Sequence, residues 1–309
     1  MTEFGHYRLE QLIGNGGTGA VYRAHDSRRD CAVAVKVLPA ELTEDALYAR
    51  RFRSVCTAVA RLREPHVIRI HDHGEIDGRL YLSMRLVEGQ SLAALLAAGP
   101  LAPDRAVELV GQVADALDAA HAAGLVHRAV KPSNILVGAA DTVHVVDFGL
   151  VQATAPTRSR PSMGGTTAGM WEYLAPERFE NRPIDARADV YSLACVLHEC
   201  LTATKPFPGD ELPALMYGHL HLPPPRPSDL VEGVPPELDD VVAKGMAKES
   251  DERYAGAGEL AAAARAALRP AVVAGVGDDR TTPVPAAVGA ARSEAGRPEP
   301  ARPDTVTAP

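Results

Sequence analysis

The sequence predicts an α+β fold with two lobes, a small β-rich lobe followed by a larger helical one. Through the first 87 residues, short apolar segments are separated by glycines and charged residues, a pattern typical of strands joined by tight turns. From residue 88 onward, apolar residues recur mainly at helical spacing. With 309 residues, 46% of them hydrophobic, the chain can bury a substantial core.

The first lobe, placed at residues 1–87, is expected to contain five strands and one long helix. The strands are expected at residues 7–12, 21–24, 32–38, 67–74 and 80–86. The helix is expected at residues 42–63, between the third and fourth strands.

The second lobe, placed at residues 88–268, is expected to be built mainly of helices. They are expected at residues 104–122, 190–201, 235–247 and 258–268. Pro103 suits the first turn of the first of these helices, where its missing N–H is not needed.

The remaining segment, residues 269–309, has a different composition. Seven of the last 40 residues are proline and none is aromatic. Such a segment buries too little apolar surface to offset the entropy of ordering it, so we predict a disordered tail. It would act as a plain linker, or its Pro-Arg content would bind a proline-recognising module.

Charge and composition exclude several classes of protein. A net charge of -8 argues against a nucleic-acid-binding surface. The four cysteines have neither the spacing of a metal site nor the density of a disulfide framework, which favours a reducing, cytoplasmic location. No window has the length and apolar character of a signal peptide or a membrane-spanning segment.

A glycine-rich segment, Gly14-Asn15-Gly16-Gly17-Thr18-Gly19, lies between the first two expected strands. Glycines let backbone N–H groups approach phosphate oxygens without interference from a Cβ atom. An ordinary hairpin turn would also explain the glycines. The sequence Val33-Ala34-Val35-Lys36 places a lysine on the third strand, where its ammonium group could pair with phosphates.

Two metal-ligand types follow in the second lobe. The segment 125–136 reads LVHRAVKPSNIL and contains Asn134. Asp147-Phe148-Gly149 begins thirteen residues after Asn134. Amide and carboxylate oxygens are ligands that Mg²⁺ prefers. Ala175-Pro176-Glu177 and the segment 189–193, DVYSL, come next.

These motifs in this order resemble the signature of protein kinases. The chain resembles the bacterial eukaryotic-type serine/threonine kinases over roughly residues 7 to 268. The resemblance implies a bilobal protein-kinase-like fold that binds ATP and Mg²⁺. It also implies two structural pairings, of Glu177 with Arg253 and of Asp189 with the catalytic loop.

The resemblance assigns the remaining site residues. Gly14, Gly16 and Gly19 would cover the phosphates, Lys36 would hold the α- and β-phosphates, and Asn134 and Asp147 would hold the metal. Lys131 would belong to the catalytic loop. The residues around adenine would be Val21, Ala34 and Leu136, with Met84 behind them and the backbone of Arg85 and Val87 at the adenine edge. Val59, Ile70, His127 and Phe148 would form the apolar column that couples the lobes.

The sequence departs from the family pattern at four positions. Ala129 stands where the family has the aspartate that accepts the proton of the substrate hydroxyl. Val55 stands where a helix glutamate would hold Lys36, so Lys36 is expected to lose its usual partner. Met170 replaces a threonine that contacts the catalytic aspartate and lysine, and Ala194 replaces a glycine, a change expected to affect packing only.

Three hypotheses for function remain open. The first is a pseudokinase that binds ATP with Mg²⁺ and acts on a partner kinase or another signalling protein as a regulator or scaffold. The second is a weakly active serine/threonine kinase, and the third is a protein-binding module that ignores nucleotide. Thr166, Thr167 and Ser162 would be phosphate acceptors facing Arg128, or ordinary residues of a flexible loop.

Overall fold

The computed structural model describes residues 2–16, 19–149, 168–209 and 211–269. The predictions for Thr166, Thr167 and Ser162, and for the tail beyond residue 269, lie outside these residues.

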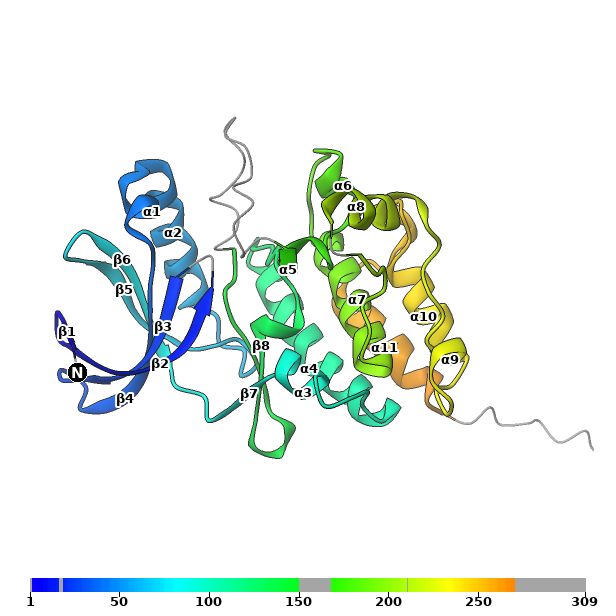
Figure 1. Cartoon of the computed structure of the whole chain (residues 1–309), viewed down its shortest axis with the longest axis horizontal. Helices are drawn as coiled ribbons and strands as arrows, with labels where there is room; N and C mark the ends of the chain where they lie inside the picture. Colours follow the sequence, from blue (N-terminus) through cyan, green and yellow to red (C-terminus); the bar gives the residue numbers. More distant parts are fainter. Residues whose placement is uncertain (1, 17–18, 150–167, 210, 270–309) are drawn as a thin grey trace, which may run out of the picture. The chain divides into compact units, whose positions relative to one another are not determined.

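The first lobe is built on one antiparallel sheet with the strand order β1-β2-β3-β4-β6-β5 (Figure 1). Its strands are β1 Thr2–Phe4, β2 Tyr7–Gly16, β3 Gly19–Asp26, β4 Cys31–Val37, β5 Ile70–Ile76 and β6 Arg79–Arg85. The five expected strands are confirmed to within a few residues. The short strand β1 was not predicted, because three residues are too few to show an alternating pattern.

The helical part of this lobe differs from the prediction of a single helix at residues 42–63. It consists of α1 Ala40–Glu44 and α2 Ala46–Val59, which meet at Asp45. Asp45 has extended backbone angles, and its carboxylate accepts hydrogen bonds from the N–H groups of Leu47 and Tyr48, 2.9 and 3.0 Å away. Because this side chain satisfies N–H groups that a helix start leaves open, α2 begins here as a separate helix.

The second lobe is mainly helical and carries a small sheet with the order β7-β8-β9 on its side facing the first lobe (Figure 1). The sheet strands are β7 Gly89–Ser91, β8 Ile135–Gly138 and β9 Val143–Val145. The helices are α3 Leu92–Leu96, α4 Pro103–Ala122, α5 Ala168–Trp171, α6 Pro176–Phe179, α7 Arg187–Thr202, α8 Leu212–His221, α9 Pro227–Leu230, α10 Glu237–Gly245 and α11 Ala257–Ala267.

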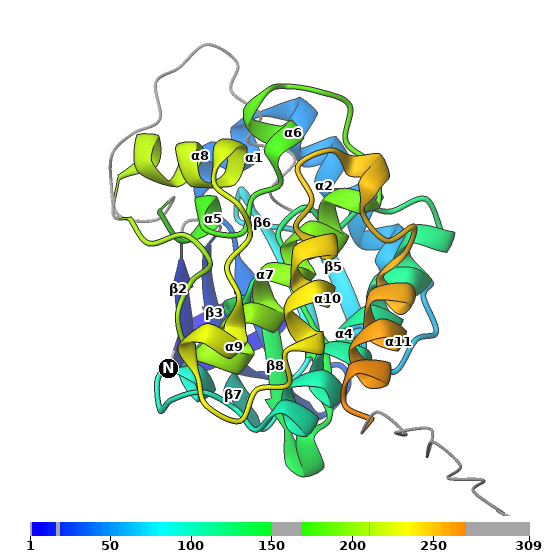
Figure 2. The same cartoon turned by 90° about the vertical axis from the view of Figure 1, so that its right-hand side faces the viewer.

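Helix α7 lies at the centre of this lobe and is buried along nearly its whole length. Helices α4, α10 and α11 pack against it, as Figure 2 shows from the helical end of the molecule. Cys195 and Cys200 are fully buried on α7, as expected of core thiols. The four predicted helices of this lobe are confirmed, whereas α8 and the short helices α3, α5, α6 and α9 were missed.

Ala194, the residue in place of a family glycine, packs against α10. A Cβ atom added to Gly245 would lie 2.6 Å from the Ala194 Cβ atom. The methyl group on α7 is therefore accommodated by a glycine on the facing helix, which agrees with a packing role.

Within the described part of the chain, no helix has both the length and the apolar character needed to cross a membrane.

Candidate nucleotide-binding site

The glycine-rich segment forms the tip of the hairpin between β2 and β3. Gly14 pairs with Val21, and Gly16 pairs with Gly19. Gly19 has a φ of +128°, and a Cβ atom at this position would overlap the carbonyl oxygen of Val37. Only glycine fits this close approach of two strands. The two residues at the very tip, 17 and 18, lie outside the described ranges.

Lys36 lies on β4, in the middle of the sheet, between Val21 of β3 and Leu82 of β6. Its side chain is only 3% exposed, and its ammonium group donates a 2.7 Å hydrogen bond to Asp147. Lys36 therefore lacks the helix glutamate, as expected, but it has another acidic partner in Asp147. The valine at position 55 does not leave the ammonium group unpaired, because a carboxylate from the second lobe holds it.

Asp147 adopts a backbone conformation that is rare for residues other than glycine, with a φ of +66°. Phe148, the next residue, is buried and lies against the ring of His127, with 4.5 Å between the ring centroids. His127 is fully buried, and its Nε2 atom is 2.9 Å from the Val146 carbonyl oxygen. These contacts hold the backbone at Asp147, so its carboxylate faces Lys36.

The apolar column expected from the resemblance consists of buried side chains. Val59 on α2 and Ile70 on β5 are 3% and 9% exposed and belong to the same apolar core as Phe148. His127 is fully buried beside Phe148. The two lobes therefore share one continuous core at this point.

Asn134 lies in a short 3₁₀ turn, Pro132–Asn134, just before β8. Its amide N–H donates a 2.8 Å hydrogen bond to the Ala129 carbonyl oxygen. Because this bond fixes the nitrogen side of the amide, the oxygen points the other way. The donor set of one amide oxygen and the Asp147 carboxylate fits Mg²⁺, which commonly takes one or two protein ligands and completes its shell with phosphate oxygens and water.

Ala129 lies at the position of the expected proton acceptor. Its side chain is a buried methyl group, and its N–H donates a 3.2 Å hydrogen bond to Nδ1 of His127. The backbone of Ala129 is therefore held by a hydrogen bond, while its side chain has no atom that can accept a proton.

Asp189 anchors the loop that carries Ala129. Its carboxylate accepts hydrogen bonds from the backbone N–H groups of His127 and Arg128, each 2.7 Å long, and lies 2.8 Å from Nε2 of His121. Arg128 has a φ of +66°, so these bonds hold a strained backbone. The predicted role of Asp189 is confirmed, and so is the pairing of Glu177 with Arg253.

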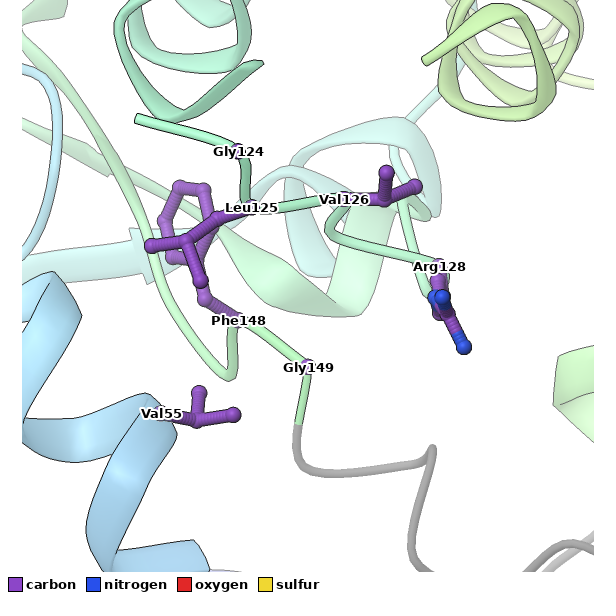
Figure 3. A pocket seen from close by; sticks show the side chains of 7 residues that line it. All are labelled: Val55, Gly124, Leu125, Val126, Arg128, Phe148 and Gly149. Carbon is purple, nitrogen blue, oxygen red and sulfur yellow. The ribbon is translucent and has the colours of Figure 1, made fainter. Parts of the chain in front are cut away.

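Val55 on α2 points toward Gly149 and Phe148 (Figure 3). A Cβ atom built on Gly149 would lie 3.2 Å from a methyl carbon of Val55. Val55 also borders a small cavity of about 80 Å³, lined by Val55, Gly124, Leu125, Val126, Arg128, Phe148 and Gly149. Position 55 therefore faces the segment that follows Asp147, but it presents two methyl groups in place of a carboxylate.

The residues expected around adenine gather on both sides of the lobe junction. Ala34 of β4 and Met84 of β6 are register neighbours and are both buried. Val21, Val87 and Leu136 are partly buried and pack against the same core. The N–H group of Arg85 donates a 2.9 Å hydrogen bond to the Arg69 carbonyl oxygen, so this N–H group already has a partner within the first lobe.

Lys131 is half-buried beside the Asp147 carboxylate. Burial lowers the pKa of Lys131, and the charges of Asp147 and Glu172 partly offset that effect. Glu172 was missed by sequence reasoning. It lies 41 residues after Lys131 and forms an ion pair with Lys205, and only the fold brings it near the catalytic loop.

Comparisons with known proteins agree with this geometry. A family model described as "Protein kinase domain" matches residues 7–262. The serine/threonine-protein kinase PknH of Mycobacterium tuberculosis (strain ATCC 25618 / H37Rv) is 49% identical over 266 residues, which cover 86% of this chain and 42% of PknH. PknE of the same strain is 50% identical over 268 residues, which cover 86% of this chain and 47% of PknE.

The chain thus spans less than half the length of these curated relatives. The crystal structure of the M. tuberculosis PknI kinase domain is similar with a TM-score of 0.70 and 29% sequence identity, covering 86% of this chain and 97% of the PknI chain. The sheet-rich first lobe and helical second lobe are those of the protein kinase fold. The chain belongs to the protein kinase domain family, within its bacterial eukaryotic-type serine/threonine branch.

Proposed function

We propose that this domain binds ATP with Mg²⁺ but is impaired in phosphoryl transfer, and that it acts in signalling as a regulatory or scaffolding pseudokinase. The observation that carries the proposal is the buried methyl group of Ala129 at the place where a carboxylate would take the proton of the attacking hydroxyl. Its partner would be another kinase or signalling protein.

Several contacts support the nucleotide-binding part. The glycine-rich segment lies at the hairpin of β2 and β3, and its missing Cβ atoms would let phosphate oxygens approach the backbone N–H groups. Lys36 and Lys131 supply positive charge next to Asp147. Asn134 and Asp147 would hold Mg²⁺, which when bound neutralises charge on the phosphates.

Magnitudes support the loss of transfer. General base catalysis contributes roughly 10²- to 10⁴-fold in rate, or about 3 to 5 kcal/mol. Phosphoryl transfer also depends on how the phosphates are positioned. Lys36 is paired with Asp147, which would also be a metal ligand. Val55 has no carboxylate that could pair with Lys36 in its place. The missing base and the altered lysine pairing act on the same step.

The proposal is tested by two measurements on the purified chain. Isothermal titration calorimetry with ATP and Mg²⁺ is expected to show binding, together with a rise in melting temperature at millimolar nucleotide. Incubation with radiolabelled ATP is expected to show transfer at least 10²-fold slower than in a variant that carries Ala129→Asp and Val55→Glu. Absence of binding would refute the first part and favour a module that ignores nucleotide, whereas rapid transfer by the parent chain would refute the second part.

A weakly active serine/threonine kinase is the second candidate. It is favoured by the intact contact between Phe148 and His127 and by the retained Lys36, Asn134 and Asp147. Transfer would then use water or the substrate itself to remove the proton. Slow incorporation of phosphate that disappears in both Lys36→Ala and Asp147→Asn would establish this candidate. A signal that persists in either variant would indicate a contaminating kinase.

A further inference from the structure

Among the described residues, the charged side chains of Lys36, Lys131 and Asp147 interact electrostatically at the proposed nucleotide site. The Lys36 ammonium group is 2.7 Å from the Asp147 carboxylate, and Lys131 interacts electrostatically with both. Two positive charges and one negative charge leave this group with a net charge of +1. Glu172, the other acid that acts on Lys131, is paired with Lys205.

The two positions that could reverse this balance are apolar. Val55 points at Gly149, as Figure 3 shows, and Gly149 lies two residues after Asp147 in the chain. The carbonyl oxygen of Ala129 accepts a hydrogen bond from the Asn134 amide. A carboxylate at either position would cancel the net positive charge, and carboxylates at both would make it -1. The phosphates of a nucleotide are strongly negative, so they are attracted to this group only in the present arrangement.

The ion pair of Lys36 with Asp147 bears directly on a metal ion. Lys36 is almost completely buried, while the Asp147 side chain is 20% exposed. An ammonium group has three N–H donors, so Lys36 can hold Asp147 and contact a phosphate oxygen at the same time. A divalent cation, in contrast, must compete with Lys36 for the Asp147 carboxylate.

From these observations we propose that nucleotide binding in this domain does not require a divalent cation, because Lys36 and Lys131 take over the neutralisation of phosphate charge. This inference rests on the proposed nucleotide binding and deepens it. Mg²⁺ is compatible with Asn134 and Asp147, but it contributes little to affinity. Val55 and Ala129 are the residues that make binding independent of the cation, because each is an uncharged side chain at a position where a carboxylate would add a negative charge.

The test compares the dissociation constant of the non-hydrolysable analogue AMP-PNP in Mg²⁺ and in EDTA, measured by calorimetry on the full chain. For the parent chain we expect the two constants to agree within about fivefold. In Val55→Glu and in Ala129→Asp, affinity in EDTA is expected to fall by about tenfold or more, because each variant adds one negative charge beside the phosphates. Mg²⁺ is expected to recover most of that loss.

Neutral variants of the same size separate charge from volume. Val55→Gln and Ala129→Asn are expected to bind AMP-PNP in EDTA about tenfold more tightly than their acidic counterparts. Melting curves show whether each variant is folded. If the acidic variant at one position does not fold, the acidic variant at the other position tests the effect of the added charge.

The outcomes distinguish this inference from the proposed function. Binding to the parent chain in Mg²⁺ that weakens more than 100-fold in EDTA would overturn the inference and leave the proposed function intact. Equal loss in the acidic and neutral variants would also overturn it, because charge would then not be the cause. Absence of binding in both buffers would overturn both claims.

Discussion

Arg253 and Glu177 form two parallel hydrogen bonds, each 2.8 Å long, inside the helical lobe. Glu177 lies on α6 and Arg253 follows the short 3₁₀ turn Ser250–Glu252, and both side chains are almost completely excluded from solvent. The guanidinium group also donates to the carbonyl oxygens of Arg187, Ala247 and Lys248. One buried cation thus joins α6 and the segment that follows α10 to the start of α7.

Removing one partner of this pair is expected to be costly. Arg253→Met would leave the Glu177 carboxylate buried without its cation, and we expect a loss of about 3 to 5 kcal/mol in the free energy of unfolding. Urea denaturation measures the loss. The matched control is Arg53→Met, because Arg53 and Glu75 form a 2.8 Å pair whose side chains are 45% and 41% exposed. That change should cost less than about 1 kcal/mol. Equal losses in the two variants would show that burial of the pair does not set its contribution to stability.

The Asp189 carboxylate is expected to keep the catalytic loop in its strained conformation. Asp189→Asn replaces an acceptor oxygen with an amide nitrogen that faces donors, so we expect a loss of about 3 kcal/mol. Hydrogen exchange at the amides of His127 and Arg128 should become faster. Asp185→Asn is the control, since Asp185 is exposed and its carboxylate accepts a hydrogen bond from the Arg187 N–H. If the loop amides stay equally protected in Asp189→Asn, this anchoring role is wrong.

The packing of α7 against α10 predicts a dependence between two small residues. A Cβ atom at position 245 would lie 2.6 Å from the Ala194 Cβ atom and 2.9 Å from a methyl carbon of Leu260. Gly245→Ala alone is expected to cost about 1 to 3 kcal/mol through overpacking. Ala194→Gly in the same chain should recover part of that loss, as a double-mutant cycle measures. Strict additivity of the two changes would show that the methyl groups do not meet.

Two buried histidines predict a decline of stability in mild acid. Burial lowers the pKa of His198 and that of His219 to about 4. In the unfolded chain their pKa returns to about 6.5, so below that pH the unfolded state binds more protons than the folded state. Stability is therefore lost as the pH falls from about 6.5 to about 4, by up to about 3 kcal/mol per histidine.

Unfolding experiments across this pH range check the histidine prediction. A variant carrying His198→Gln and His219→Gln should show a flatter pH dependence between 6.5 and 4 than the parent chain. His221→Gln, a change at an exposed histidine, should leave the slope as it is. A slope that is unaffected by the double change would assign the acid sensitivity to other groups.

The order of elements was predictable from sequence because strands and helices repeat their apolar residues with different periods. The break between α1 and α2 was missed because apolar spacing continues across Asp45, and only its capping bonds end one helix and begin the next. The anchors Asp189 and Glu177 were placed correctly, since the motifs that contain them are local in sequence.

The partner of Lys36 could not be predicted in the same way. Lys36 and Asp147 are 111 residues apart. The partner of Lys36 depends on the absence of a carboxylate at position 55 as well as on the carboxylate of Asp147. Likewise, Glu172 comes near Lys131 only through the fold. Charges that meet across lobes are a property of packing, so sequence spacing carries little information about them.

We propose that the methyl group of Ala129, together with the valine at position 55, limits transfer in a nucleotide-binding site. The most direct measurement compares phosphate incorporation from radiolabelled ATP into a generic protein substrate by the parent chain and by the variant with Ala129→Asp and Val55→Glu. We expect incorporation to rise at least 10²-fold in the variant. Fast incorporation by the parent chain that Lys36→Ala abolishes, with no further gain in the double variant, would contradict it.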